Sequence, residues 1–168
     1  MMRRFRGESV HRVDQKGRVS VPAPFRRVLE EGDPDWQPGQ NPTFVLVYGI
    51  TGGSCLEGYT VAGAAAIDER IARVPDRKMR EALQRKFDSQ SAYAQVDENG
   101  RIVLPQKLRD MFGLAEEALF AGMGEKFQVW EPEAYRKDMA ALEEWSDALP
   151  EGEDLFAALD AVGRGGQS

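Results

Sequence analysis

The chain has 168 residues, 42% of them hydrophobic and 30% charged, a composition typical of a globular protein and too apolar for general disorder. The formal net charge is −6, and the single cysteine and single histidine exclude an internal disulfide framework, a multi-thiolate zinc site and a two-histidine metal site. No run approaches the roughly 18 apolar residues of a transmembrane helix, and no apolar segment follows the first arginines as in a secretory signal. We therefore expect a cytoplasmic protein that holds no metal and no cofactor.

Charge is distributed unevenly along the chain. Residues 1–27 carry eight basic and two acidic side chains, a local charge of +6, whereas residues 131–168 carry three basic and ten acidic ones, a local charge of −7. A protein that is acidic overall can present a basic face, because electrostatic fields in physiological salt decay within about 8 Å. The basic residues of the first segment are Arg3, Arg4, Arg6, Arg12, Lys16, Arg18, Arg26 and Arg27.

The chain contains an internal repeat in which residue n corresponds to residue n + 83, without a gap from residue 13 to residue 29. Five further pairs, of which Val13/Val96 is the first and Val28/Met111 the last, are apolar in both copies. We infer two copies of one module. The identical anchor pairs are Asp14/Asp97, Gly17/Gly100, Arg18/Arg101, Pro22/Pro105 and Arg26/Arg109.

Each copy is predicted to begin with a β-hairpin followed by a short helix. The segments VDQKGRVSVP (13–22) and VDENGRIVLP (96–105) alternate apolar residues around a polar turn that contains glycine, which is typical of a hairpin. Asp14 and Asp97 can cap the amides of these turns. Because proline cannot continue a central strand but is tolerated in the first turn of a helix, helices are expected over 22–31 and 105–114.

A second strand pair and closing helices are expected in each copy. Residues 31–42 form a loop that the second copy lacks, and the acidic tail contains one short helix, EDLFAALDA (153–161). We place the first module at 5–77, a linking helix at 78–87, the second module at 88–145 and an acidic, partly flexible tail at 146–168. The expected strands are 44–50, 55–61, 118–124 and 126–132, and the expected helices after them are 66–74 and 132–145.

Two Asp-x-x-Gly-Arg turns, each followed by an apolar strand, a proline and a short helix, resemble the SpoVT/AbrB-type swapped-hairpin module. The doubled arrangement, with FRG (5–7), DQKGRVSVP (14–22), DENGRIVLP (97–105) and KFQVWEPEAY (126–135), resembles the MraZ family over about residues 5–145. The resemblance implies an α+β fold in which two tandem β-β-α-β-β modules form a pseudo-twofold swapped-hairpin barrel, related to double-psi barrels, with flanking helices.

The same resemblance implies a function. MraZ-like proteins are transcriptional regulators of the bacterial division and cell-wall gene cluster, and they bind short direct repeats in its promoter as rings of identical subunits. Their Asp-x-x-x-Arg motif falls on Asp14/Arg18 and Asp97/Arg101 of this chain. The resemblance therefore implies double-stranded DNA and further copies of the chain as partners, and a place at the nucleoid.

The chemistry of the turn residues agrees with DNA binding. An arginine at a hairpin tip can enter the major groove and pair with guanine, and other basic side chains can contact phosphates. We expect Asp14, Gly17, Asp97 and Gly100 to shape the turns; the alternative for the Asp14–Arg18 pair is an ion pair that only shapes the hairpin. The first copy is expected to contribute more, since its turn is the more basic one. The residues predicted to contact DNA are Arg3, Arg4, Arg6, Arg12, Lys16, Arg18 and Arg101, the first four of them through phosphates.

The sequence leaves two other classes of function to consider. An antitoxin-like interaction protein would bind its partner through the tail helix, with Leu155, Phe156 and Leu159. An enzyme is not expected, and no catalytic residue is assigned. His11 and Cys55 are the only pair for Cys–His catalysis, and neither GITGGS (49–54) nor GMGEK (122–126) has the Gly-Lys-Ser/Thr ending of a phosphate-binding loop.

Overall fold

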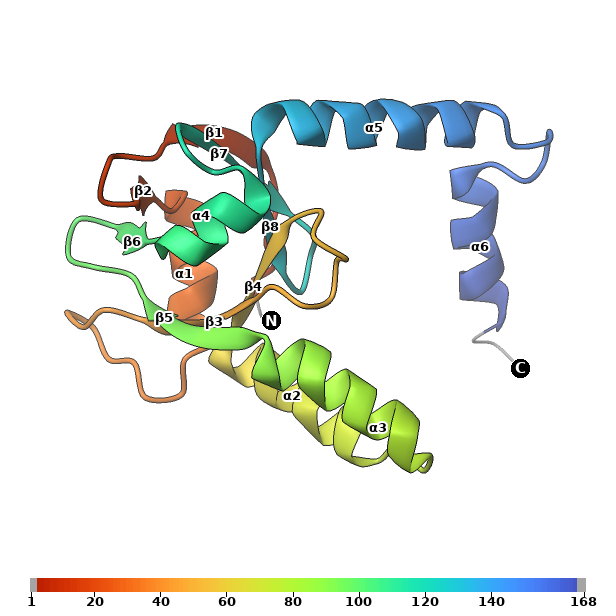
Figure 1. Ribbon diagram of the computed structural model, residues 1–168. Coiled ribbons are helices and arrows are strands. Elements are labelled where there is room, and N and C mark those ends of the chain that lie inside the picture. The colour runs from red at the N-terminus through yellow and green to blue at the C-terminus, as the bar shows by residue number, and fades with distance from the viewer. Residues whose placement is uncertain (1–2, 166–168) are drawn as a thin grey trace. The chain divides into compact units, whose positions relative to one another are not determined.

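A computed structural model describes residues 3–165 of the chain, which form two compact units, one ending at Pro132 and one beginning at Glu133 (Figure 1). The tail at 146–168 is predicted to be partly flexible, and its last residues, 166–168, lie outside the described range. The second unit is helical, with α5 (Pro132–Asp147) entering it from the first unit and α6 (Leu155–Gly165) following. The elements of the first unit are β1 (Glu8–Arg12), β2 (Arg18–Ser20), α1 (Ala23–Glu31), β3 (Thr43–Val47), β4 (Leu56–Thr60), α2 (Val61–Ala72), α3 (Arg77–Gln84), the π-helix η1 (Arg85–Ser89), β5 (Ser91–Gln95), β6 (Arg101–Val103), α4 (Gln106–Phe112), β7 (Glu117–Gly122) and β8 (Phe127–Trp130).

Both copies of the repeat contribute strands to one six-stranded antiparallel sheet, in the order β1-β7-β8-β4-β3-β5. The first strand of each copy pairs with a strand of the other copy: β1 lies beside β7, and β5 lies beside β3. β4 and β8, which are equivalent in the repeat, pair with each other in the middle. The two copies therefore complete each other's sheet. The predicted α+β class is confirmed, whereas the module boundaries stay a prediction.

A second, two-stranded sheet is formed by β2 and β6 and is called the ribbon below (Figure 1). Val19 of β2 pairs with Ile102 of β6, and these two residues are equivalents under the 83-residue shift. A residue paired with its own equivalent marks the point through which a local twofold axis passes. Both side chains are buried in the core. Since strand side chains alternate, their neighbours on the ribbon face outward.

The predicted hairpins are wrong in one respect, because their two arms do not pair with each other. β1 pairs with β7 and β2 pairs with β6, so only the turn between them is closed. In that turn the N–H of Asp14 donates to the carbonyl of Arg18 (3.0 Å), and the N–H of Gly17 donates to the carbonyl of Asp14 (2.9 Å). Alternating apolar residues reveal a strand but not its partner, and here the partners lie about 80 or more residues away in the chain.

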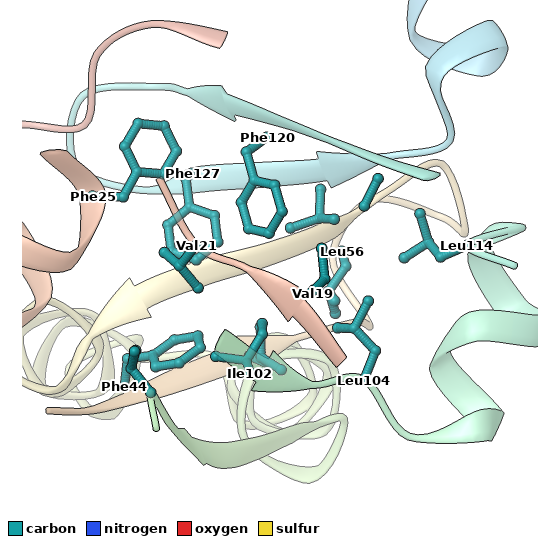
Figure 2. Close-up of a cluster of buried hydrophobic side chains, with 14 of the residues drawn as sticks. Val19, Val21, Phe25, Phe44, Leu56, Ile102, Leu104, Leu114, Phe120 and Phe127 are labelled. Atoms are coloured by element: carbon teal, nitrogen blue, oxygen red, sulfur yellow. The ribbon is translucent and has the colours of Figure 1, made fainter. Parts of the chain in front are cut away.

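The main core is built from both copies, whose side chains point toward one another in Figure 2. Phe127 lies among four other phenylalanine rings, with centroid distances of 5.1 Å to Phe5, 5.5 Å to Phe25, 5.8 Å to Phe120 and 6.0 Å to Phe44. Burying one large apolar side chain is worth about 1.5–3 kcal/mol. Much of the stability of each copy therefore depends on the other copy.

The outer side of the sheet has its own smaller cluster, with Val47, Tyr59, Ile71 and Phe87 from β3, β4, α2 and η1. α2 begins at Val61, five residues before the expected helix, because the hydroxyl of Thr60 accepts a hydrogen bond from the N–H of Gly63 (2.9 Å) and caps the helix. No helix within residues 3–165 combines the length and apolar character required to span a bilayer.

The carboxylate of Glu57 is buried within this sheet, although no sequence pattern predicts its burial. Glu57 of β4 is 1% exposed and accepts bonds from the ammonium of Lys126 (2.8 Å), the amide of Gln128 (3.0 Å) and the hydroxyl of Tyr59 (3.1 Å). The pKa of Tyr59 is raised by burial and by the adjacent Glu57 charge. A buried charge with three donors is compensated, so this network links β4 to β8 and to the turn before it.

Candidate functional site

The turn between β1 and β2 is organised by its own aspartate. One carboxylate oxygen of Asp14 accepts the backbone N–H groups of Lys16 (3.0 Å) and Arg18 (2.8 Å), and the other accepts the side-chain Nε of Arg18 (2.6 Å). These bonds favour the charged carboxylate, so the pKa of Asp14 is lowered, mainly by the backbone N–H of Arg18. The Asp14–Arg18 ion pair, which is the alternative role of these two residues, is thus present. It engages Nε of Arg18, and the Nη atoms of that guanidinium have no partner within the described chain.

The equivalent turn between β5 and β6 has the same backbone hydrogen bonds, but its arginine side chain makes different contacts. The carboxylate of Asp97 accepts the N–H groups of Asn99 (2.8 Å) and Arg101 (2.9 Å), and the pKa of Asp97 is lowered mainly by the latter bond. The side chain of Arg101 makes no ion pair with Asp97, and its buried Nε has no hydrogen-bond partner among residues 3–165. The two aspartates therefore act alike on the backbone, while the two guanidinium groups are held differently.

The ribbon brings the two arginines to one surface. Arg18 lies opposite Val103 and Arg101 lies opposite Ser20, and residues opposite each other in an antiparallel ladder share a face. Ser20 and Val103 are exposed, Val103 at 57%, so the face that carries both arginines is turned to solvent. The charge of Arg18 also helps to lower the pKa of Asp97, so the two turns interact electrostatically.

Arg12 joins this face, whereas Arg3 and Arg4 do not. Arg12, Arg18 and Arg101 line one shallow hollow together with residues of the first turn. Arg3 forms an ion pair with Glu31 at the end of α1 (3.0 Å), and both Arg3 and Arg4 line a different hollow, beside Thr60. Arg3 and Arg4, from which phosphate contacts are expected, therefore lie on another part of the surface.

The remaining predicted contact residues are exposed. Lys16 lies at the tip of the first turn, and Arg6 lies just before β1. Sequence reasoning missed Ser20 and Val103, which share the outer face of the ribbon with the two arginines. The alternation around Val19 contained that signal, but only the pairing of β2 with β6 shows that the two strands form one surface.

The pair considered for Cys–His catalysis is not assembled. His11 lies on β1 and Cys55 directly precedes β4, and β7 and β8 separate these strands by about 14 Å at the usual spacing. The His11 ring contacts the hydroxyl of Ser9 (2.8 Å), and its pKa is lowered by burial. The Cys55 side chain is completely buried. Within residues 3–165 no cluster of three or more His, Cys, Asp or Glu side chains is arranged to hold a metal ion.

Comparisons with known proteins agree on one family. A family model described as "MraZ protein, putative antitoxin-like" matches residues 89–155. A relative from Ruegeria pomeroyi is 52% identical over 165 residues, covering 97% of this chain and 99% of the relative. One from Cereibacter sphaeroides is 42% identical over 171 residues with the same coverage, and one from Caldicellulosiruptor saccharolyticus is 33% identical over 135 residues, covering 80% and 85%. All three relatives bear the name "Transcriptional regulator MraZ".

Proposed function

The chain belongs to the MraZ family, and from this membership we propose that it regulates transcription by binding double-stranded DNA in a sequence-specific manner through the ribbon. The observation that supports the proposal most is the shared outer face, on which Arg18 and Arg101 from different copies lie beside exposed Ser20. A major groove about 12 Å wide admits a two-stranded β-ribbon, so this face has a suitable form.

The side chains of the ribbon match the chemistry of base edges. A guanidinium can donate two hydrogen bonds to O6 and N7 of guanine, which is worth roughly 1–3 kcal/mol of discrimination, and the Nη donors of Arg18 are available for it. The exposed methyl groups of Val103 suit the methyl group of thymine. Arg12 lines the hollow beside the ribbon and Lys16 lies in the turn that leads into β2, so both can contact the adjacent phosphates, which would add affinity and salt dependence without selecting a sequence.

The first turn is assigned the larger share of recognition. Its tip carries Gln15 and Lys16, whereas the second tip carries Glu98 and Asn99, and the acidic side chain opposes an approach to phosphates. Arg3, Arg4 and Arg6 are assigned to phosphates farther along the DNA. Asp14, Asp97 and their turn glycines shape the backbone and do not read bases.

Assembly is part of the proposal, because one ribbon covers only a few base pairs. A ring homo-oligomer that presents several ribbons to direct repeats would gain about 10²–10⁴-fold in affinity through effective concentration. The proposed target is the promoter of the division and cell-wall gene cluster, including that of the protein's own gene, at the nucleoid. In this role the protein needs no catalysis and no cofactor. The exchange of β1 and β5 between the copies supports the swapped-hairpin assignment of the modules.

The proposal is tested by gel-shift titration of DNA from upstream of the protein's own gene against scrambled DNA, at several salt concentrations. Arg18→Ala should reduce the preference for the cognate DNA about 5- to 150-fold, corresponding to the 1–3 kcal/mol of a bidentate contact, and should retain salt-sensitive binding to both DNAs. Arg77→Ala, which removes an exposed arginine on α3, is the matched control and should retain the preference. Equal binding of both DNAs by the wild type, or an unchanged preference in Arg18→Ala, would contradict the proposal.

The assembly part is tested with DNA that carries one or several repeats. Several repeats should bind far more tightly than one, with the largest gain when the repeats are spaced about one helical turn apart, so that the ribbons face the same side of the duplex. Equal affinity for one repeat and for several would contradict the assembly part. It would leave DNA recognition by a single ribbon intact.

An antitoxin-like role is the second candidate, and the second unit contains an observation that favours it. Leu155, Phe156, Leu159 and Val162 of α6 are 55–78% exposed, an apolar surface of the kind that a partner protein covers. The matching family model is described as antitoxin-like. In this case a stoichiometric protein partner should copurify with the wild type and with Trp145→Ser, but not with Phe156→Ser. Purification without such a partner would contradict this role.

A further inference from the structure

Each turn of the ribbon packs against an arginine that belongs to the other copy of the repeat. Gly17, in the first turn, has φ +83°, and a Cβ atom placed there would overlap the carbonyl of Leu104 and lie 2.8 Å from Nε of Arg109. Both of these residues come from the second copy. The first turn is therefore in close contact with the start of α4, and glycine is required at this position by both conformation and space.

Hydrogen bonds connect the same groups. The N–H of Leu104 donates to the carbonyl of Gly17 (2.7 Å), and Nε of Arg109 donates to the carbonyl of Leu104 (2.9 Å). Nη1 of Arg109 also reaches the carbonyl of Gln15 at 3.5 Å. One guanidinium thus contacts both the strand end that holds the turn and the backbone at the tip of the turn.

The second turn repeats the backbone contact and the close approach of the arginine with the copies exchanged, but the buried Nε of Arg26 has no hydrogen-bond partner among residues 3–165. The N–H of Val21 donates to the carbonyl of Gly100 (2.9 Å), and a Cβ atom on Gly100 would overlap Nη1 of Arg26 in α1. Val21 and Arg26 are the equivalents of Leu104 and Arg109 under the 83-residue shift. The backbone hydrogen bond and the packing of an arginine against the turn glycine thus occur twice, related by the internal symmetry, which indicates that they belong to the architecture, whereas the guanidinium hydrogen bonds are specific to Arg109.

We propose that Arg109 is a positioning residue for the Asp14–Arg18 turn and that Arg26 is a positioning residue for the Asp97–Arg101 turn. Each short helix thereby controls the arginine on the turn of the other copy. The inference rests on the proposed function, since it assumes that these turns read DNA. Its physical reason is geometric: base readout requires side chains held within about 0.5 Å of the productive position, and a loop reaches that precision only when a rigid element supports it.

The two helices supply matched controls. Lys107 lies on α4 two residues before Arg109, but it is exposed and its ammonium group lies over the ring of Tyr48. Arg27 lies on α1 beside Arg26 and is exposed. Removing either control residue removes the same charge from the same helix without touching a turn. Lysine in place of Arg109 keeps the charge but lacks the planar fork that serves Leu104 and Gln15 together.

A double-mutant cycle measured by gel shift on cognate and scrambled DNA tests the proposal. Arg109→Ala should lower the ratio of cognate to scrambled affinity on the order of tenfold, within the range for coupled neighbours, and should leave the salt dependence unchanged. The effect should largely vanish in an Arg18→Ala background and persist in full in an Arg101→Ala background. The mirror variant Arg26→Ala should couple to Arg101→Ala and not to Arg18→Ala.

Two further measurements separate positioning from general damage. Arg109→Lys, which preserves charge and bulk, should show a similar loss of selectivity, and hydrogen exchange of the amides of residues 15–18 should become faster while the core amides stay protected. The control Lys107→Ala should change neither. Additive effects of Arg109→Ala and Arg18→Ala, or unchanged selectivity in Arg109→Lys and Arg109→Ala, would overturn the crossed assignment alone. Unchanged selectivity in Arg18→Ala would instead overturn the proposed function.

Discussion

Replacing Gly17 with alanine tests the crossed packing through stability alone, without DNA. The new Cβ atom would be added to a residue with φ +83°, which costs an L-residue about 1–2 kcal/mol. It would also overlap the carbonyl of Leu104 and displace that residue, whose N–H donates to the Gly17 carbonyl, at a cost of about 1 kcal/mol for one hydrogen bond. We expect the free energy of unfolding to fall by about 2–3 kcal/mol, measured by urea denaturation.

Gly39→Ala is the matched control, because Gly39 has a similar φ of +90° but no atom within 4 Å of the added Cβ. It should show only the conformational cost, about 1–2 kcal/mol. In thermal unfolding, 1 kcal/mol corresponds to about 2–4 °C for a chain of this length, so the two variants should be resolved. Equal losses for Gly17→Ala and Gly39→Ala would refute the claim that the first turn lies against the second copy.

Three further predictions concern charged groups. The lowered pKa of Asp14 means that its carboxylate stabilises the fold above its ordinary pKa of 3.8 and that this contribution is lost as the pH falls below that value. Asp14→Asn should therefore lower the denaturation midpoint at pH 7, and the difference from the wild type should shrink as the pH is lowered. Burial and the adjacent Asp88 raise the pKa of Asp68 to about 6, so the fold loses stability as the pH rises from about 4 to 6. Asp68→Asn should therefore have a higher denaturation midpoint than the wild type at pH 7.5 but not at pH 4. Glu57→Ala should cost about 1–3 kcal/mol in urea denaturation, because it leaves the hydroxyl of Tyr59 and the amide of Gln128 without their acceptor, and an unchanged denaturation midpoint would contradict that account.

Local features of the candidate site could be predicted from the sequence, because their causes are local. Asp14 caps amides within four residues of itself, as turn chemistry requires. The repeat was recognisable for the same reason, since both copies need the same turn residues at the same spacing. Apolar equivalence was a weaker guide: Val28 is 6% exposed, but its equivalent Met111 is 42% exposed.

The partners of the strands could not be predicted, because they depend on groups far apart in the chain. Ser20 and Val103 become part of one face only through the pairing of β2 with β6, and the contact of Arg109 with the first turn spans 94 residues to Gln15. Periodicity specifies which side of a strand is apolar and leaves the neighbouring strand open. For the same reason, the predicted hairpin has its turn in the correct place, but the strands on either side of that turn, β1 and β2, pair with β7 and β6 and not with each other.

The sequence by itself determined the duplication, the two aspartate-capped turns and the uneven distribution of charge, since each follows from residue types at short spacing. Only the tertiary structure decided that the two copies are interleaved, that both turn arginines lie on one ribbon, and that Arg3 and Arg4 lie apart from it. The physical reason is that neither copy can bury its apolar strands alone. Burial is satisfied by the strands of the other copy, and that exchange places the two turns side by side.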